Sequence, residues 1–336
     1  MLNKKNQNRG TTETPGGSNS EHPQEFEIRR ALRDIWIVVL LASSVVLLHA
    51  QDLAPRAYVI TPLHSNAVTL TYGFYSGSLL LNGAVPVSGT TGTYSVPVFT
   101  YSHSFGLLGR SANISASIPY AIGTFEGEVS GSDTQIYRSG LLDMAFRVSV
   151  NLKGGPAMQV SEFRQWVEKS LMGVSVKVVP PTGQYDPNRL INWGSNRWSF
   201  KPEFGYSRRR KHMVLDGYAG MWLFTKNQQS YSPTGPQPQT QNPIGSFESH
   251  LSYDLKPRLW FSLDGNFWIG GEASLNGVDN PATRQTSSRI GLTASVPVTK
   301  HQSVKFSYSD DIYTRFGGAY RNVSAAWQYS WVGRPQ

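Results

Sequence analysis

Charged and polar side chains, which could bind a ligand or take part in a reaction, alternate with apolar side chains in many segments of this sequence. In the segment 197–207, for example, Lys201 and Glu203 alternate with Phe200 and Phe204. Both signs of charge recur on such polar faces, which predicts ion pairs and polar contacts in an enclosed space rather than a reaction centre. The charged residues predicted on these faces are Arg147, Lys177, Lys201, Glu203, Asp216, Glu248, Asp264 and Arg289, together with Asp143, His250 and Lys305.

Four aromatic residues share the same polar faces, namely Tyr218, Trp222, Trp260 and Trp268. Their rings suit a flat, weakly polar solute, which stacks on aromatic faces and makes a few hydrogen bonds. Each of them could instead belong to an aromatic girdle at a membrane rim. The charges likewise fit two roles, because they can stiffen a packed interior or contact a solute directly. We therefore take Tyr218, Trp222, Trp260, Trp268 and the first eight charged residues as candidates for solute binding.

Sequence patterns typical of reaction centres are missing. The seven histidines are scattered singly, and the chain has no HExxH, Gly-x-Ser-x-Gly or phosphate-binding glycine motif. It also has no cysteine, which excludes disulfides and thiolate metal sites. We expect no catalytic residue, no metal site and no cofactor, so the protein is predicted not to be an enzyme. A hydrolase with a site assembled across several strands is the enzymatic alternative.

Alternation with a period of two predicts β-strands, because successive side chains of a strand point to opposite faces. The clearest case is 321–331, where Trp327, Tyr329 and Trp331 alternate with Ala326, Gln328 and Ser330. A bilayer is crossed by ~9–11 residues of a tilted strand. Segments of about this length are found at 68–75, 94–105, 112–122, 140–152, 171–180, 197–207, 213–225, 244–255, 258–270, 288–298, 303–313 and 321–331. The predicted fold is an all-β, up-and-down antiparallel transmembrane barrel of about 12 strands.

The connections between these segments alternate between short and long. Short periplasmic turns and long outer loops are typical of outer-membrane barrels. The link 153–170 breaks the rhythm, and helical spacing of Val160, Phe163 and Trp166 predicts either a short amphipathic helix at the membrane surface or an ordered loop. The Pro- and Gln-rich loop 232–243 is expected to be mobile. The basic run 208–211 is expected to be a solvated turn near lipid headgroups, with no nucleic acid as a partner.

The N-terminal part of the sequence divides into two segments. Residues 1–28 are polar and are expected to be disordered. Residues 29–50 have arginines, an apolar stretch and a small residue at the end, which is typical of a cleaved signal peptide. A single membrane anchor is the alternative, but it would need about 17–25 apolar residues. The barrel is then formed by 51–336. The full chain has a net charge of +9 and the part 51–336 a net charge of +8, which favours anionic solutes or lipids only weakly.

The segment 173–205 contains Pro180-Pro-Thr-Gly-Gln-Tyr-Asp-Pro187, and 215–224 and the end of the chain add further matching stretches. With these motifs the chain resembles the outer-membrane transporter family named for the meta-pathway of phenol degradation. The resemblance covers nearly all of the chain after residue 51 and implies an outer-membrane barrel that passes hydrophobic or aromatic compounds. The resemblance implies no catalytic residues. The prolines are expected to end strand pairing, and Tyr185 and Trp193 to lie at the outer interface.

Two functions follow as expectations. The first is a channel or facilitator in the bacterial outer membrane for small hydrophobic or aromatic solutes, and the second is a structural or adhesive barrel with a closed lumen and partner-binding loops. Small-molecule solutes, outer-membrane lipid and the barrel-assembly machinery are the expected partners. The assembly machinery would recognise the last strand, which ends on the aromatic Trp331.

Overall fold

The structure is a computed structural model, and it describes residues 54–80, 87–129, 132–232 and 235–333. The predicted extension 1–28 and the predicted signal peptide 29–50 lie outside these described residues. No helix in the described ranges is long and apolar enough to cross a bilayer.

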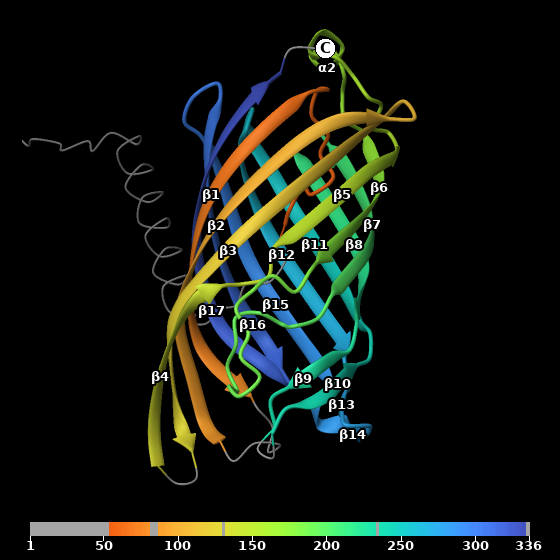
Figure 1. The fold of residues 1–336 in the computed structure, drawn as a ribbon. Coiled ribbons are helices and arrows are strands. Elements are labelled where there is room, and N and C mark those ends of the chain that lie inside the picture. Colours follow the sequence, from red (N-terminus) through yellow and green to blue (C-terminus); the bar gives the residue numbers. More distant parts are fainter. Residues whose placement is uncertain (1–53, 81–86, 130–131, 233–234, 334–336) are drawn as a thin grey trace, which may run out of the picture. The chain divides into compact units, whose positions relative to one another are not determined.

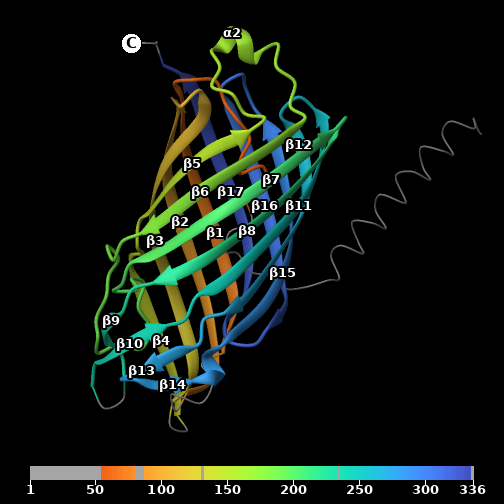
Figure 2. The same ribbon diagram turned by 90° about the vertical axis from the view of Figure 1, so that its right-hand side faces the viewer.

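Twelve antiparallel strands close into a barrel (Figures 1 and 2). They are β1 (Ser65–Leu80), β2 (Val87–Leu107), β3 (Arg110–Val129), β4 (Ser132–Leu141) continued by β5 (Ala145–Lys153), β6 (Ser170–Val179), β7 (Ser199–Arg210), β8 (Met213–Phe224), β11 (Ile244–Lys256), β12 (Leu259–Gly270), β15 (Gln285–Pro297), β16 (Gln302–Thr314) and β17 (Gly317–Val332). The barrel is closed by β1 and β17, which pair from Ser65↔Val332 to Leu80↔Gly317. Each of the twelve predicted segments overlaps one of these strands, so the predicted fold is confirmed.

Burial of the side chains is inverted relative to a soluble protein. On β12, Phe261 and Leu263 are 49% and 48% exposed, whereas Ser262 and Asp264 beside them are 3% and 1% exposed. The other strands follow the same rule, with an apolar belt outside and mostly Ser, Asn and charged side chains inside. An Arg or Lys that faced lipid at mid-bilayer would cost about 2–4 kcal/mol. This sorting therefore identifies the outer surface as lipid-facing, and it confirms the predicted polar faces.

The two ends of the barrel differ. One end, here called the turn end, has the short turns and both chain ends of the barrel, where the N–H of Gly333 donates to the carbonyl of His64 at 2.8 Å. In bacterial barrels this end is periplasmic. The short helix α2 (Val160–Phe163) lies at the same end (Figure 1). The opposite end, the loop end, has a small second sheet of β9 (Asn227–Ser230), β10 (Gln237–Gln241), β13 (Ala273–Leu275) and β14 (Val278–Asn280), with the 3-10 helix η1 (Pro281–Thr283).

One sequence-based expectation about the connections is wrong, and one is partly tested. The loop 232–243 was expected to be mobile, but its second half forms β10, which pairs with both β9 and β13. The helix that was expected as one of two alternatives in 153–170 is present as α2. Phe163 and Trp166 are partly buried and pack on the cluster of Ile60, Met158 and Leu171. Contact of this helix with the membrane surface stays a prediction.

The predicted strand 140–152 is interrupted between β4 and β5. The prediction of Asp143 and Arg147 on the polar face places the alternate residues Leu142 and Met144 on the apolar, lipid-facing side. In the structure residues 142–144 leave the ladder with β3, and Leu142 lines an interior cavity. The side chain of Asp143 explains the break, because it accepts the N–H of Gly183 at 2.8 Å and anchors the loop 180–198.

Candidate functional site

The N-terminal segment 54–64 enters the turn end of the lumen and places Tyr58 against the wall. Gly173 of β6 and Gly205 of β7 pair directly with each other and leave a slot for the phenol ring. A Cβ atom on Gly205 would come within 2.1 Å of the Tyr58 ring. The Tyr58 hydroxyl lies 3.0 Å from both the Ser175 hydroxyl and the Glu203 carboxylate, and the Tyr58 side chain is 2% exposed.

Arg56 fixes the same segment to the neighbouring part of the wall, which is formed by β8, β11 and β12. Its guanidinium pairs with Asp254 at 2.8 Å and lies 4.5 Å from the ring centre of Trp260. Its backbone N–H donates to the Asp216 carboxylate at 3.1 Å. The next N–H, of Ala57, donates to the Tyr218 hydroxyl at 3.0 Å. Asp216, Tyr218 and Trp260 therefore bind the N-terminal segment 54–64, which is called the plug below because it lies inside the turn end of the lumen.

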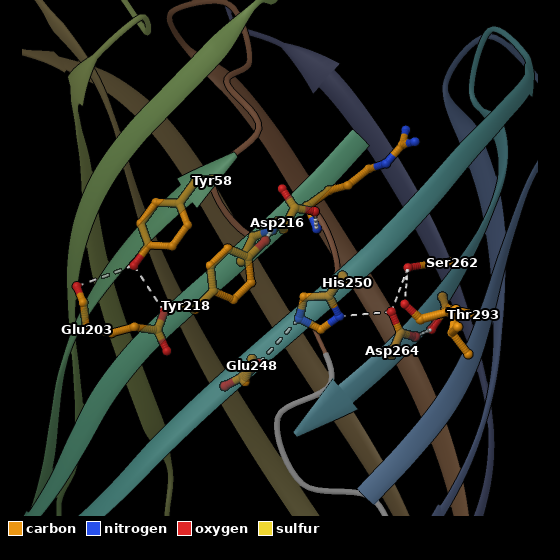
Figure 3. Close-up of polar contacts among 12 residues, drawn as sticks. Tyr58, Glu203, Asp216, Tyr218, Glu248, His250, Ser262, Asp264 and Thr293 are labelled. Carbon is orange, nitrogen blue, oxygen red and sulfur yellow. Dashed lines mark hydrogen bonds and ion pairs between the residues drawn. The ribbon is translucent and has the colours of Figure 1, made fainter. Parts of the chain in front are cut away.

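A chain of ion pairs lies beside this plug (Figure 3). Lys201 bridges Glu203 and Glu248, with N–O distances of 2.9 and 2.8 Å. Glu248 continues to His250 at 3.6 Å, and the other ring nitrogen of His250 lies 2.8 Å from Asp264. These groups come from β7, β11 and β12 and are almost fully buried, so they cross-link the barrel wall. The Asp264 carboxylate also accepts hydrogen bonds from the hydroxyl groups of Ser262 and Thr293, each at 2.6 Å.

The loop-end half of the lumen contains a cavity of about 820 Å³. Four candidates from the sequence line it, namely Lys177, Trp222, Trp268 and Arg289. The other eight candidates lie outside the cavity lining. Of these, Arg147, Lys201, Glu203, Asp216, Tyr218, Glu248, Trp260 and Asp264 contribute to the plug contacts and the ion-pair chain. Solute contact by any of the twelve remains a prediction.

An aromatic cluster that the sequence patterns did not reveal adjoins the cavity through one of its members, Tyr75, which is part of the lining. Tyr94 lies at the centre of the cluster, with ring centres of Tyr75, Tyr320 and Trp193 at 4.8, 5.0 and 5.6 Å. Phe125 completes the cluster at 5.6 Å from Trp193. Trp193 was expected at the outer interface, but the loop 180–198 brings it against these inner rings. Inner-facing Tyr94 and Phe125 were missed because an aromatic residue fits either face of a membrane strand.

The wall of the cavity is thin at two places. The pairing of β16 with β17 ends at Ser309↔Asn322, although β16 stays paired with β15 as far as Thr314 and β17 stays paired with β1 from Gly317. Residues on both sides of this divergence line the cavity. On β1 and β2, Thr71 and Val98 line both the cavity and a mostly apolar groove of about 560 Å³ formed with lipid-facing residues. The cavity is thus separated from lipid by little protein at these positions.

No cluster of at least three His, Cys, Asp or Glu side chains suited to a metal ion occurs in the part of the chain that the structure describes. The polar groups instead pair with one another or line the cavity. The arrangement can bind a flat organic molecule through aromatic faces, hydroxyl groups and a few charges.

A family model described as "Putative MetA-pathway of phenol degradation" matches residues 81–325, which is more than half of the 336 residues. The chain belongs to this family. The resemblance based on the motifs in 173–224 is thereby confirmed. A comparison with curated proteins found no match.

Several solved structures have a similar fold. An outer-membrane channel from Pseudomonas putida F1 is 16% identical, with a TM-score of 0.68, and the match covers 83% of this chain and 100% of that one. The transport unit of the autotransporter AIDA-I from Escherichia coli is 10% identical with a TM-score of 0.47 over 84% and 93% of the chains. The toluene transporter TbuX of Ralstonia pickettii is 9% identical with a TM-score of 0.37 over 82% and 90%. The first similarity supports the fold, whereas the other two are too weak for any argument. A closed barrel with an even number of strands and a lipid-facing belt is an outer-membrane protein of bacteria.

Proposed function

We propose that this family member is an outer-membrane channel that admits small hydrophobic or aromatic solutes through its loop end. The observation that carries the proposal is the cavity of about 820 Å³, whose lining includes Trp222, Trp268 and Phe224 next to hydroxyl side chains. Ligand cavities in proteins have volumes of roughly 300–1,000 Å³ and mostly apolar walls with a few polar groups. A single aromatic ring fits this volume easily.

The indole rings supply the binding energy in this proposal. Stacking between aromatic rings contributes about 0.5–1.5 kcal/mol beyond the burial of apolar area. Such contacts are weak enough for a solute to leave again, which a channel requires. The segment 54–64 occupies part of the lumen at the turn end, so large hydrophilic solutes are not expected to pass.

Uptake of labelled toluene by bacterial cells tests the proposal. The cells should lack their own hydrocarbon channels and keep their lipopolysaccharide, which slows the direct entry of apolar solutes. We expect faster uptake with this protein than without it. Trp222→Ala and Trp268→Ala should each reduce the gain about two- to tenfold, because each removes one stacking face. Trp198→Ala is the matched control, since Trp198 lies on the outer side and is 45% exposed.

The rival function is a structural or adhesive barrel, and the plug is the observation that favours it. A permanently closed barrel would give no uptake of toluene above the background of the cells. Equal uptake by cells with and without the protein would therefore support the rival and remove the channel. Unchanged uptake in both cavity variants would leave a channel but would exclude this cavity as its route.

A further inference from the structure

We infer that the cavity selects small aromatic carboxylates, with the carboxylate at Arg197 and the aromatic ring against Trp222 or Phe224. The inference rests on the proposed function, because it names the chemical class of solute that the proposed channel prefers. It is carried by the charges of the cavity lining, by the contacts of Arg197 and by the rings beside this arginine.

Positive charge exceeds negative charge among the described residues of the lining. The charged members are Lys177, Arg197, Arg289, Asp143 and Asp311. Both carboxylates are already occupied by donors of the protein. Asp143 accepts the N–H and the hydroxyl of Ser195 at 2.8 and 2.5 Å, in addition to the N–H of Gly183. Asp311 binds Nε and Nη2 of Arg289, both at 2.8 Å. Neither carboxylate therefore makes an ion pair with Arg197.

Arg197 has hydrogen-bond partners that leave its positive charge without an ion pair among the described residues. Its Nη2 donates to the side-chain oxygen of Gln241 at 2.5 Å, which is an uncharged acceptor. Its Nη1 is buried and has no hydrogen-bond partner, and the side chain makes no ion pair with a described residue. Burial lowers the pKa of Arg197 to about 10, against the opposing effect of nearby Asp143, so the guanidinium stays charged at neutral pH. A buried donor without an acceptor is costly, and a buried cation is stabilised by an anion that hydrogen-bonds to it.

Aromatic rings adjoin this cation. The guanidinium carbon of Arg197 lies 4.3 Å from the ring centre of Phe224, and the ammonium of Lys177 lies 5.4 Å from the ring centre of Trp222. Trp222 and Phe224 follow one another on the inner face of β8, and both line the cavity. A solute with a carboxylate attached to a benzene ring can therefore pair with Arg197 while its ring packs on β8. A neutral aromatic solute would make the second contact only, and an inorganic anion the first only.

Equilibrium dialysis of labelled benzoate and labelled benzyl alcohol against the purified full chain in detergent tests the inference. Binding to protein-free micelles is subtracted. These two probes have nearly the same size and differ in charge. We expect benzoate to bind about tenfold more tightly than benzyl alcohol, which is the usual magnitude for one charge-assisted hydrogen bond. Raising the salt concentration should weaken benzoate binding and leave benzyl alcohol binding unchanged.

Variants of single arginines test whether the preference for benzoate depends on Arg197. Arg197→Gln should lose the tenfold preference for benzoate and keep its affinity for benzyl alcohol, whereas Arg197→Lys should keep part of the preference. Arg284→Gln is the matched control, because Arg284 is exposed at the loop end and is not part of the cavity lining. If Arg197→Gln does not fold, the salt series still tests the preference for the carboxylate, and Arg197→Lys compared with Arg284→Gln tests its location.

The outcomes separate the inference from the proposed function. Equal affinity for the two probes in the unmodified protein, or an unchanged preference in folded Arg197→Gln, would overturn the inference and leave a channel for neutral aromatic solutes. Binding of neither probe would contradict both. If the preference for benzoate also disappears in Arg284→Gln, the general charge of the loop end causes the preference. That result would overturn the site at Arg197.

Discussion

At the scale of single residues, two glycines decide whether the turn end is closed. Gly173 and Gly205 face each other across β6 and β7, and Tyr58 fills the space that their missing side chains leave. No other residue would leave room for the ring at these positions. The plug is thus encoded partly in the wall and partly in the segment before the first strand.

We therefore expect Gly205→Ala to displace Tyr58 from its slot and to raise the ion conductance of the barrel. Single-channel recording in planar bilayers measures this. Gly217→Ala is the control, because a Cβ atom at this position of β8 meets open space. Identical conductance for Gly205→Ala and the unmodified protein would show that the ring does not close the lumen.

A second prediction at the residue scale concerns stability. Lys201 is 4% exposed and neutralises Glu203 and Glu248, so Lys201→Met would leave two buried carboxylates without this partner. Removal of one partner from a buried ion pair costs roughly 3–5 kcal/mol. Urea unfolding of the barrel in lipid vesicles should show a loss of this size. Lys256→Met, at the exposed turn end, should change the unfolding midpoint little, and an equal midpoint for both variants would contradict the prediction.

At the scale of elements, the strands were predictable and their interruptions were not. Period-two alternation identified all twelve strands because lipid and a polar lumen select opposite side chains. The break at 142–144 was not predicted, because Leu142 and Met144 continue the apolar alternation. The contacts of Asp143 with the loop 180–198 explain why the chain turns inward there. The aromatic cluster around Tyr94 was missed for a related reason. The alternation separates the two faces only where their polarity differs.

The divergence of β16 and β17 gives a prediction at the same scale. Asp310 and Arg321 follow the last paired residues, Ser309 and Asn322, and would be the next pair if the register continued. The chain has no cysteine, so Asp310→Cys with Arg321→Cys can be cross-linked selectively, by oxidation or with a short bismaleimide. We expect the cross-link to lower toluene uptake, because it closes the wall between the cavity and the lipid.

The control for this cross-link is the pair Ser303→Cys and Gln328→Cys, which lies within the closed ladder and outside the cavity lining. Cross-linking there should leave uptake unchanged. If the cross-link at 310 and 321 also has no effect, solutes do not leave the cavity between these strands.

At the scale of the whole molecule, the barrel has two possible exits for two classes of solute. An apolar solute can leave the cavity sideways, where the wall is thin, whereas a carboxylate would meet hydrocarbon there at a high cost in free energy. An aromatic anion held at Arg197 must therefore pass the plug to reach the periplasm. We expect Gly205→Ala to speed benzoate flux through the barrel and the cross-link between β16 and β17 to leave it unchanged. Flux measured in lipid vesicles checks both, and a cross-link that slows benzoate would contradict the axial route.

Sequence patterns predicted the architecture of the whole molecule because it follows from alternation, strand length and an even strand number. The sequence patterns did not predict which of the inner residues line the cavity and which contact the plug. Eight of the twelve candidates contribute to the plug contacts or the ion-pair chain, and four line the cavity. This division depends on where the segment 54–64 enters, and its Arg56 and Tyr58 have no periodic pattern that would indicate a position inside the barrel.

The central claim is that an aromatic solute sits in the loop-end half of the lumen. Diffraction from crystals of the full chain soaked in bromobenzene tests it most directly, since the anomalous signal of bromine marks the ring. We predict a bromine peak inside the cavity, within contact distance of Trp222 or Trp268. The account would be contradicted if crystals soaked to saturation showed bromine peaks only on the lipid-facing belt and none in the cavity.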